Sequence, residues 1–146
     1  MPFSGFSERA IRFLGELSQN NERAWFEAHR DEYESLLVEP AKEFVVELGS
    51  LLRGLDPKIH AIPRVRGSIK AMEQLRGFRK NPRPPYKDHL DVWFWSGTRR
   101  MWDNAGFFLR LTPTRLILAG GMIEFQKDAL ARYRERAVEH RERVER

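Results

Sequence analysis

Cationic side chains are concentrated in one short stretch, RGFRKNPRPPYK, which covers residues 76–87 and contains no acidic residue. Guanidinium and ammonium groups bind phosphate or carboxylate, and guanidinium does so through paired hydrogen bonds. Three prolines exclude a helix and lower the entropy that is lost when the loop is ordered around a ligand. We therefore expect an anion-binding loop here. Its expected contacts are Arg79, Lys80, Arg83, Tyr86 and Lys87, supported by Arg64 and Arg66.

The alternative is an exposed proline-rich connection whose charges only keep the chain in solution. The whole chain is also basic, with a formal net charge of +5. Such a surface attracts anionic partners, so a nucleotide, a phosphorylated metabolite and nucleic acid all remain open as ligands. Because arginine greatly outnumbers lysine, the same composition is also expected from a coding sequence rich in G and C.

Tryptophans and arginines follow the basic loop, with Trp93, Trp95 and Trp102 close to Arg99 and Arg100. Aromatic rings beside cations are typical of proteins that stack nucleotides or single-stranded nucleic acid. The competing interpretation is a buried strand, because large residues alternate on both of its faces. We favour burial of these tryptophans.

Acid–base chemistry has one candidate pair. His89 lies two residues before Asp91, so a strand places both on one face, where the carboxylate can orient the imidazole. The alternative is a purely structural polar cluster at the start of the strand, in which the two side chains satisfy each other's hydrogen-bonding groups. The four histidines are scattered without metal-ligand spacing, and the absence of cysteine excludes thiolate catalysis and cysteine-based zinc sites. We expect neither a metal nor a cofactor.

The elements that must position these residues begin with helices. Ser7 is a suitable N-cap for a first helix, with Ile11, Leu14 and Leu17 on one face. Asn21 is the expected N-cap of a second helix, and a third is expected to run from Pro40 to about residue 55. The face of the second helix carries Trp25, His29, Tyr33 and Leu37.

Strand patterns dominate the middle of the chain. Residues 58–69 predict a short strand and a turn, and residues 89–96 predict a longer strand. The segment GFFLRL-TPT-RLILAGG predicts a β-hairpin with Phe107, Leu109 and Leu111 on one face and Phe108 and Arg110 on the other. A charged helix follows residue 125. The pattern predicts a single α+β domain over residues 1–146, with N-terminal helices packed on a small, mainly antiparallel sheet and a C-terminal helix.

Several segments together resemble the bacterial family DUF2461. They are NNERAWFEAHRDEY, EPAKEFVVEL, the Pro85–Tyr86–Lys87 triplet, GFFLRLTP, the Gly120–Gly121 pair and DALARYRERA. The resemblance covers nearly the whole chain in order and implies an α+β fold, but no established activity. It also implies an arginine-rich strand before the loop, where this chain has Ala71, Gln74 and Gly77. Family members usually continue beyond residue 146, so we expect a divergent, shortened member.

The sequence leaves three functions open. The leading hypothesis is a domain that binds an anionic ligand through the basic loop. The second is an enzyme that uses the same cationic site with His89 and Asp91, and the third is a structural or interaction domain. No apolar run reaches the length of about 20 residues needed to span a membrane, and the N-terminus lacks a secretory signal, so we expect a cytoplasmic protein.

Overall fold

The computed structural model describes residues 2–74, 83–98 and 100–145. The first helix, α1 (Glu8–Gln19), begins where the sequence predicts, because the Ser7 hydroxyl accepts a hydrogen bond from the Ala10 backbone N–H at 3.1 Å. Its buried face carries Phe13, Leu14 and Leu17. Both the predicted N-cap and the predicted apolar face of α1 are confirmed.

The predicted second and third helices form one nearly continuous helical run. It consists of α2 (Arg23–Ala28), α3 (Arg30–Tyr33), the π-helical η1 (Glu34–Val38) and α4 (Glu39–Leu55). Pro40 has no N–H to donate to the preceding turn, and the backbone N–H of Glu39 instead reaches the carbonyl of Glu34. The wider π-turn therefore carries the chain into α4 without a break.

Asn21 is not the N-cap of this run, so that prediction is wrong. The capping position is held by Glu22, which makes no side-chain capping hydrogen bond. The side chain of Asn21 is instead engaged by the backbone of a residue 65 positions away.

The sheet has four antiparallel strands in the order β1 (Ile59–His60), β2 (Leu90–Ser96), β3 (Gly106–Leu111) and β4 (Leu116–Gly121). Asp91 pairs with Arg110 and Trp93 with Phe108, which confirms the predicted faces of β2 and of the hairpin. With helices and an antiparallel sheet together, the α+β class is confirmed. The assignment of residues 1–146 to one domain stays a prediction.

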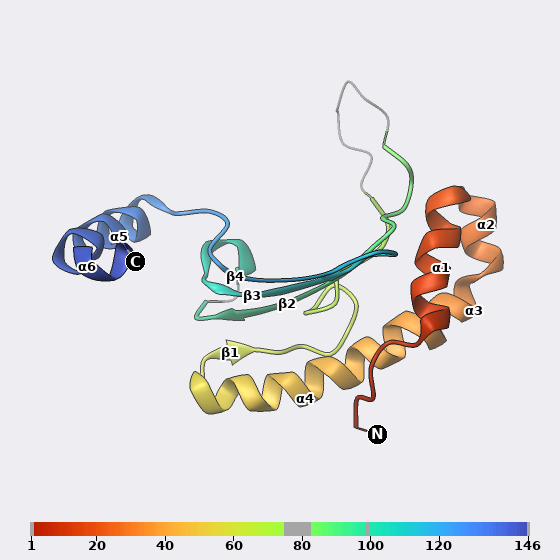
Figure 1. Ribbon diagram of the computed structural model, residues 1–146, viewed down its shortest axis with the longest axis horizontal. Coiled ribbons are helices and arrows are strands. Elements are labelled where there is room, and N and C mark those ends of the chain that lie inside the picture. The colour runs from red at the N-terminus through yellow and green to blue at the C-terminus, as the bar shows by residue number, and fades with distance from the viewer. Residues whose placement is uncertain (1, 75–82, 99, 146) are drawn as a thin grey trace.

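The two faces of the sheet have different environments. Helix α4 lies along one face, which we call the inner face, and α1 to α3 lie beside one end of the sheet (Figure 1). Inner-face residues of β2 and β3 join α1 and α4 in one apolar core. These buried residues include Phe13, Leu17, Val45, Leu90, Val92, Phe94, Leu109 and Leu111. The opposite outer face carries Asp91, Trp93, Phe108 and Arg110.

The end of the chain makes few contacts with this core. Helices α5 (Lys127–Glu139) and α6 (Arg141–Val144) have no buried residue and point away from the sheet (Figure 1). All six residues of β4 are exposed. Among the described residues, no helix has the length and hydropathy that are required to cross a bilayer.

The tryptophans divide between two environments. Trp95 is 5% exposed, as the sequence predicts, and Trp93 is partly buried. Trp102 lies on the short 3-10 helix η2 (Met101–Asp103) and is 47% exposed. The predicted burial of Trp102 is therefore wrong, because η2 lies outside the sheet and no inner-face helix reaches it.

Candidate functional site

The two ends of the basic loop are held together by backbone hydrogen bonds. Gln74 N–H donates to the Pro85 carbonyl and Lys87 N–H donates to the Met72 carbonyl, both at 2.8 Å. Residues 72–74 and 85–87 therefore run side by side like two short strands. Arg79 and Lys80, two of the expected ligand contacts, lie outside the described residues, and Arg83 is exposed.

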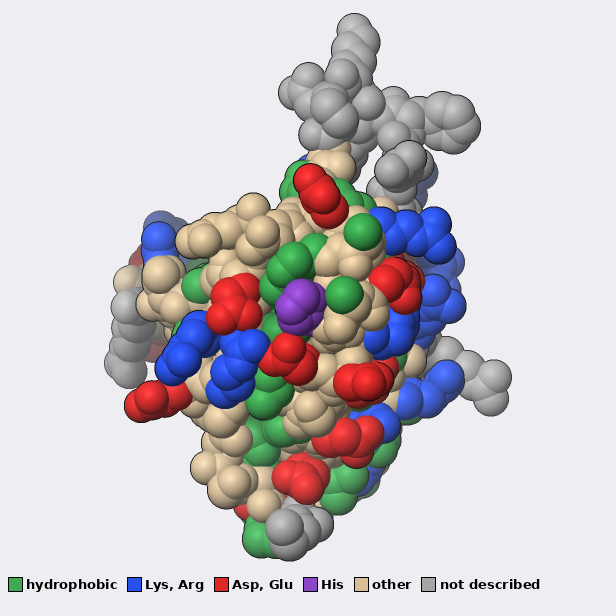
Figure 2. Space-filling view, turned by 90° about the vertical axis from the view of Figure 1, so that its right-hand side faces the viewer, with side chains coloured by type: hydrophobic (Ala, Val, Ile, Leu, Met, Phe, Trp, Pro, Cys, Tyr) green, Lys and Arg blue, Asp and Glu red, His purple; other side chains and the backbone are tan. Residues whose placement is uncertain are grey.

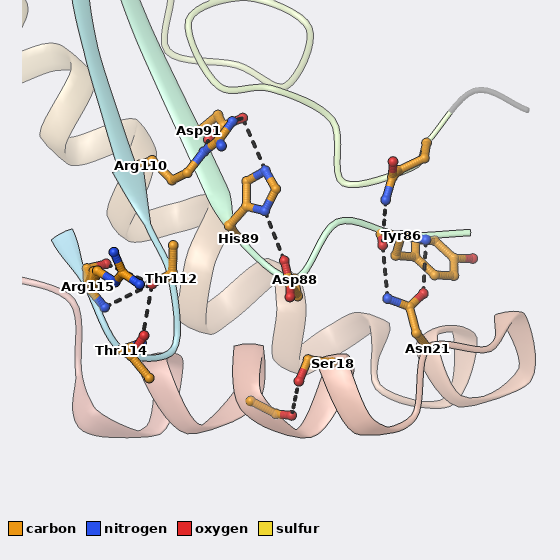
Figure 3. A network of polar contacts seen from close by, with 12 residues as sticks. Ser18, Asn21, Tyr86, Asp88, His89, Asp91, Arg110, Thr112, Thr114 and Arg115 are labelled. Atoms are coloured by element: carbon orange, nitrogen blue, oxygen red, sulfur yellow. Dashed lines mark hydrogen bonds and ion pairs between the residues drawn. The ribbon is translucent and has the colours of Figure 1, made fainter. Parts of the chain in front are cut away.

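Tyr86 anchors this pair of segments from the inside. Its ring is 5% exposed and stacks on Phe26, with centroids 4.0 Å apart. The Asn21 side chain donates to the Tyr86 carbonyl at 2.9 Å and accepts from the Tyr86 N–H at 3.0 Å (Figure 3). Because the ring faces the core, Tyr86 positions its neighbour Lys87 and does not offer its ring to a ligand.

Replacing Asn21 with alanine is expected to lower the free energy of unfolding by about 2 kcal/mol, because two hydrogen bonds are lost at a buried backbone. Urea denaturation at neutral pH measures the change. Asn20→Ala is the matched control, because the Asn20 side chain makes only an exposed hydrogen bond, to the Glu16 carbonyl. We expect a loss of about 0.5 kcal/mol there. Equal losses in the two variants would contradict an anchoring role for Asn21.

Arg64 and Arg66, expected to support the loop, lie in the turn before it. Both side chains are exposed, and Arg66 Nη2 is 3.6 Å from Glu73 Oε2. Arg66 also lines a cavity of about 280 Å³ with Arg30, Glu34 and Glu73. The charges around that cavity are mixed, so it has no strong preference for an anion.

Asp91 and Arg110 form a paired ion bridge across the outer face. Arg110 Nε lies 2.7 Å from Asp91 Oδ1, and Arg110 Nη2 lies 2.9 Å from Asp91 Oδ2 (Figure 3). His89 joins them, with Nε2 at 3.5 Å from Asp91 Oδ2 and Nδ1 at 2.9 Å from Asp88 Oδ1. The structure thus brings the predicted pair His89 and Asp91 together.

The surroundings of this pair favour the charged form of each group. Burial alone would raise the pKa of Asp91, but hydrogen bonds from His89 and Arg110 outweigh it and lower that pKa. The hydrogen bond to Asp91, followed by that to Asp88, raises the pKa of His89 against the effect of burial. Each imidazole nitrogen already faces a carboxylate. The arrangement favours a structural ion network over a general base.

Lys70 lies beside this network, on a short segment that pairs with β2 along the same edge as β1. Its N–H donates to the Asp91 carbonyl at 2.9 Å, and Ile69 forms a bridge with Val92. Ile69 enters the core, so the next side chain, that of Lys70, lies on the outer face. Burial, followed by repulsion from Lys87, lowers the pKa of Lys70 to about 8.

Neither Lys70 nor Lys87 forms an ion pair with a carboxylate of the described residues. Asp91 is the nearby acid that raises the pKa of Lys70, but Arg110 already holds both of its oxygens. Lys70 Nζ donates to the Gly67 carbonyl at 3.4 Å, and the positive charge of Lys87 contributes to its lowered pKa. This arrangement can accept an external anion.

The end of the molecule formed by the N-terminal helices carries charges of both signs. On the face that Figure 2 shows, acidic and basic side chains are interspersed. A groove that follows a nucleic-acid backbone needs a run of positive charge, and this face does not provide one. Among the described residues, Lys70 and Lys87 form the centre of the candidate cationic site.

The sequence patterns do not predict Lys70, Arg110 or Asn21 as site residues. Lys70 had one available signal, because SIK alternates polar, apolar and polar residues as a half-buried strand does. Arg110 stood in the predicted hairpin on the face opposite Leu109. Nothing local marked Asn21 as a contact of Tyr86, because the contact depends on the tertiary fold.

Comparisons with known proteins give one match. No curated protein and no solved structure matches the chain. A family model described as "Conserved hypothetical protein (DUF2461)" matches residues 9–146. That range includes every helix and strand described above except the first residue of α1, and every residue of the candidate site, as the sequence resemblance implied. The chain therefore belongs to the DUF2461 family.

Proposed function

We propose that the chain binds a phosphate-bearing or otherwise anionic ligand on the outer face of the sheet, between Lys70 and Lys87. The proposal is supported by two lysines, Lys70 and Lys87, that form no ion pair with a carboxylate among the described residues, and by the lowering of the Lys70 pKa by the charge of Lys87. A bound anion removes their mutual repulsion and satisfies both charges. Arg83, and with it Arg79 and Lys80, stays a proposed contact from the loop.

The enzyme hypothesis has less support. Asp91 is held as a carboxylate by Arg110, and His89 faces Asp88 and Asp91 with its two nitrogens. A general base needs a nitrogen that can reach the substrate proton. In this proposal, His89 and Asp91 have a structural role and hold the start of β2 in place next to Lys87.

A second candidate is an interaction domain. Helix α5 buries none of its residues, and Tyr133 and Val138 are 53% and 79% exposed. An unpacked amphipathic helix of this length is only marginally stable in water. This observation keeps a protein partner for α5 as the alternative function. The cytoplasmic location expected from the sequence stays part of the proposal.

Pyrophosphate is expected to raise the Tm of the purified protein at low ionic strength. Binding to the folded state alone stabilises it by about 2.7 kcal/mol at a hundredfold excess over Kd, which corresponds to a Tm rise of several degrees for a chain of this size. Sodium chloride at matched ionic strength is the salt control. Lys87→Met is expected to lose most of the rise.

Lys127→Met is the matched control variant, because Lys127 is an exposed lysine on α5. It should respond to pyrophosphate as the unmodified protein does. A rise no larger than that in sodium chloride would overturn the proposal. An equal rise in Lys87→Met and in the unmodified protein would overturn the assigned site.

A further inference from the structure

Aromatic rings adjoin the cationic site on the same face of the sheet. The Trp102 ring lies 5.6 Å from the Trp93 ring, which lies 4.7 Å from the Phe108 ring. Lys70 Nζ is 5.9 Å from the centre of the Trp102 ring, and Arg110 Cζ is 5.2 Å from that of Phe108. Cations and aromatic surface are therefore continuous here.

A recess opens next to these rings. It has a volume of about 330 Å³, within the range of small-molecule sites. The described residues that line it carry no charge, and three of them are glycines. Its lining includes Trp93, Phe108, Ala119, Gly120, Met122 and Ile123. A flat apolar group fits this surface better than a second charge does.

Trp102 is held in position despite its exposure. The Asn104 side chain donates to the Arg100 carbonyl at 2.6 Å and to Thr98 Oγ1 at 2.8 Å, which closes the loop around η2. The Gln126 side chain donates to Asp103 at 2.8 Å. A fixed, half-exposed tryptophan loses little entropy when a ring stacks on it.

We infer that the anion bound by this site carries a flat aromatic ring, as a nucleotide does. The ring lies against Trp102 and Trp93, and the phosphate lies toward Lys70 and Lys87. This inference rests on the proposed function and specifies its ligand class. The size of the recess beside Trp93 and Phe108, about 330 Å³, suits a single base and favours a mononucleotide as the ligand class.

The test compares AMP with ribose 5-phosphate, which has the same phosphate and sugar but lacks the base. Stacking contributes about 1–3 kcal/mol per base, so calorimetry should show AMP binding about tenfold tighter or more. In Trp102→Leu the two affinities should become similar, while that of ribose 5-phosphate stays unchanged. Trp102→Phe keeps a ring and should retain part of the preference for AMP.

Tyr133→Leu is the matched control, because Tyr133 is also about half exposed but lies on α5, away from the outer face. It should keep the full preference for AMP. Equal binding of the two ligands to the unmodified protein would overturn the inference and leave the proposed anion site standing. Binding of neither would overturn both. Binding of a short single-stranded oligonucleotide without binding of AMP would overturn the inference in favour of a strand.

Discussion

Replacing Arg110 with methionine is expected to lower the free energy of unfolding by about 3 kcal/mol at neutral pH. Asp91 is 5% exposed, and it loses both hydrogen bonds of the paired bridge in this variant. Breaking a buried ion pair from one side costs about 3–5 kcal/mol, because the remaining charge stays buried. We take the lower end of this range because the Arg110 side chain is itself 36% exposed and His89 remains beside Asp91. Urea denaturation measures the loss.

Arg115→Met is the matched control, because Arg115 is an exposed arginine in the same hairpin. Its side chain forms no ion pair with any carboxylate that the structure describes, so we expect a change within about 0.5 kcal/mol. The double variant Asp91→Leu/Arg110→Met should recover part of the loss, since it leaves no buried charge without a partner. Equal stability of Arg110→Met and Arg115→Met would show that the bridge contributes nothing.

The same ion pair makes the stability of the protein depend on pH in the acid range. The native pKa of Asp91 lies below its ordinary value of about 3.9. The stability from this group is therefore present above the unfolded pKa and is lost as the pH falls through the lower native pKa. The difference in the free energy of unfolding between Arg110→Met and the unmodified protein should accordingly become smaller below about pH 3.9.

Lys70→Met is expected to stabilise the protein by about 2 kcal/mol at neutral pH and to abolish its response to pyrophosphate. The native pKa of Lys70 is about 8, against an ordinary lysine pKa of about 10.4. Because each pKa unit is worth about 1.4 kcal/mol, the charged side chain costs roughly 3 kcal/mol in the folded protein. Methionine keeps the apolar stem without the charge. Binding sites often retain such destabilising groups for function.

The pH dependence of stability shows whether Lys70→Met stabilises the protein by removing a charge or by improving the packing. Between about pH 8 and pH 10.4 the unfolded chain binds a proton at Lys70 that the native protein has lost, so stability rises with pH in this window. Lys70→Met should lack that rise. The raised pKa of His89 acts with the opposite sign, since its stabilisation is complete below about pH 6.5 and is lost as the pH rises through the native value.

Because both proteins contain His89, subtracting one stability curve from the other isolates the effect of Lys70. Urea denaturation at several pH values provides the curves of stability against pH. Lys127→Met is again the control, and its curve should have the same slope as that of the unmodified protein. If Lys70→Met were less stable than the unmodified protein, or kept the alkaline rise, the lysine would not be under electrostatic strain.

Local patterns in the sequence determined the main elements. Ser7 and the apolar face of residues 11–17 specify α1, because capping and a 3.6-residue period depend only on near neighbours. Alternation in GFFLRL specifies which side chains of β3 face the core, as its pairing with β2 confirms. The resemblance to DUF2461, confirmed over residues 9–146, also followed from the sequence alone.

The tertiary structure decided how the candidate site is assembled. Asn21 looked like a helix cap, but the fold brings the Tyr86 backbone to it, across 65 residues, and uses its amide there. The alternation in SIK indicates only a half-buried strand at Lys70, and the pairing of this segment with β2 is what places Lys70 near Lys87 and Asp91. Trp102 looked like a core residue, yet it is half exposed and its ring lies against Trp93 on the outer face.

The physical reason is the difference in range between the two kinds of interaction. Helix caps, side-chain periods and proline geometry act over a few residues, so one stretch of sequence contains all their determinants. Burial and charge repulsion depend on which distant segments meet. The sequence of this chain therefore fixes its α+β elements and their faces, whereas the packing of residues 68–70 against β2 creates the cationic site.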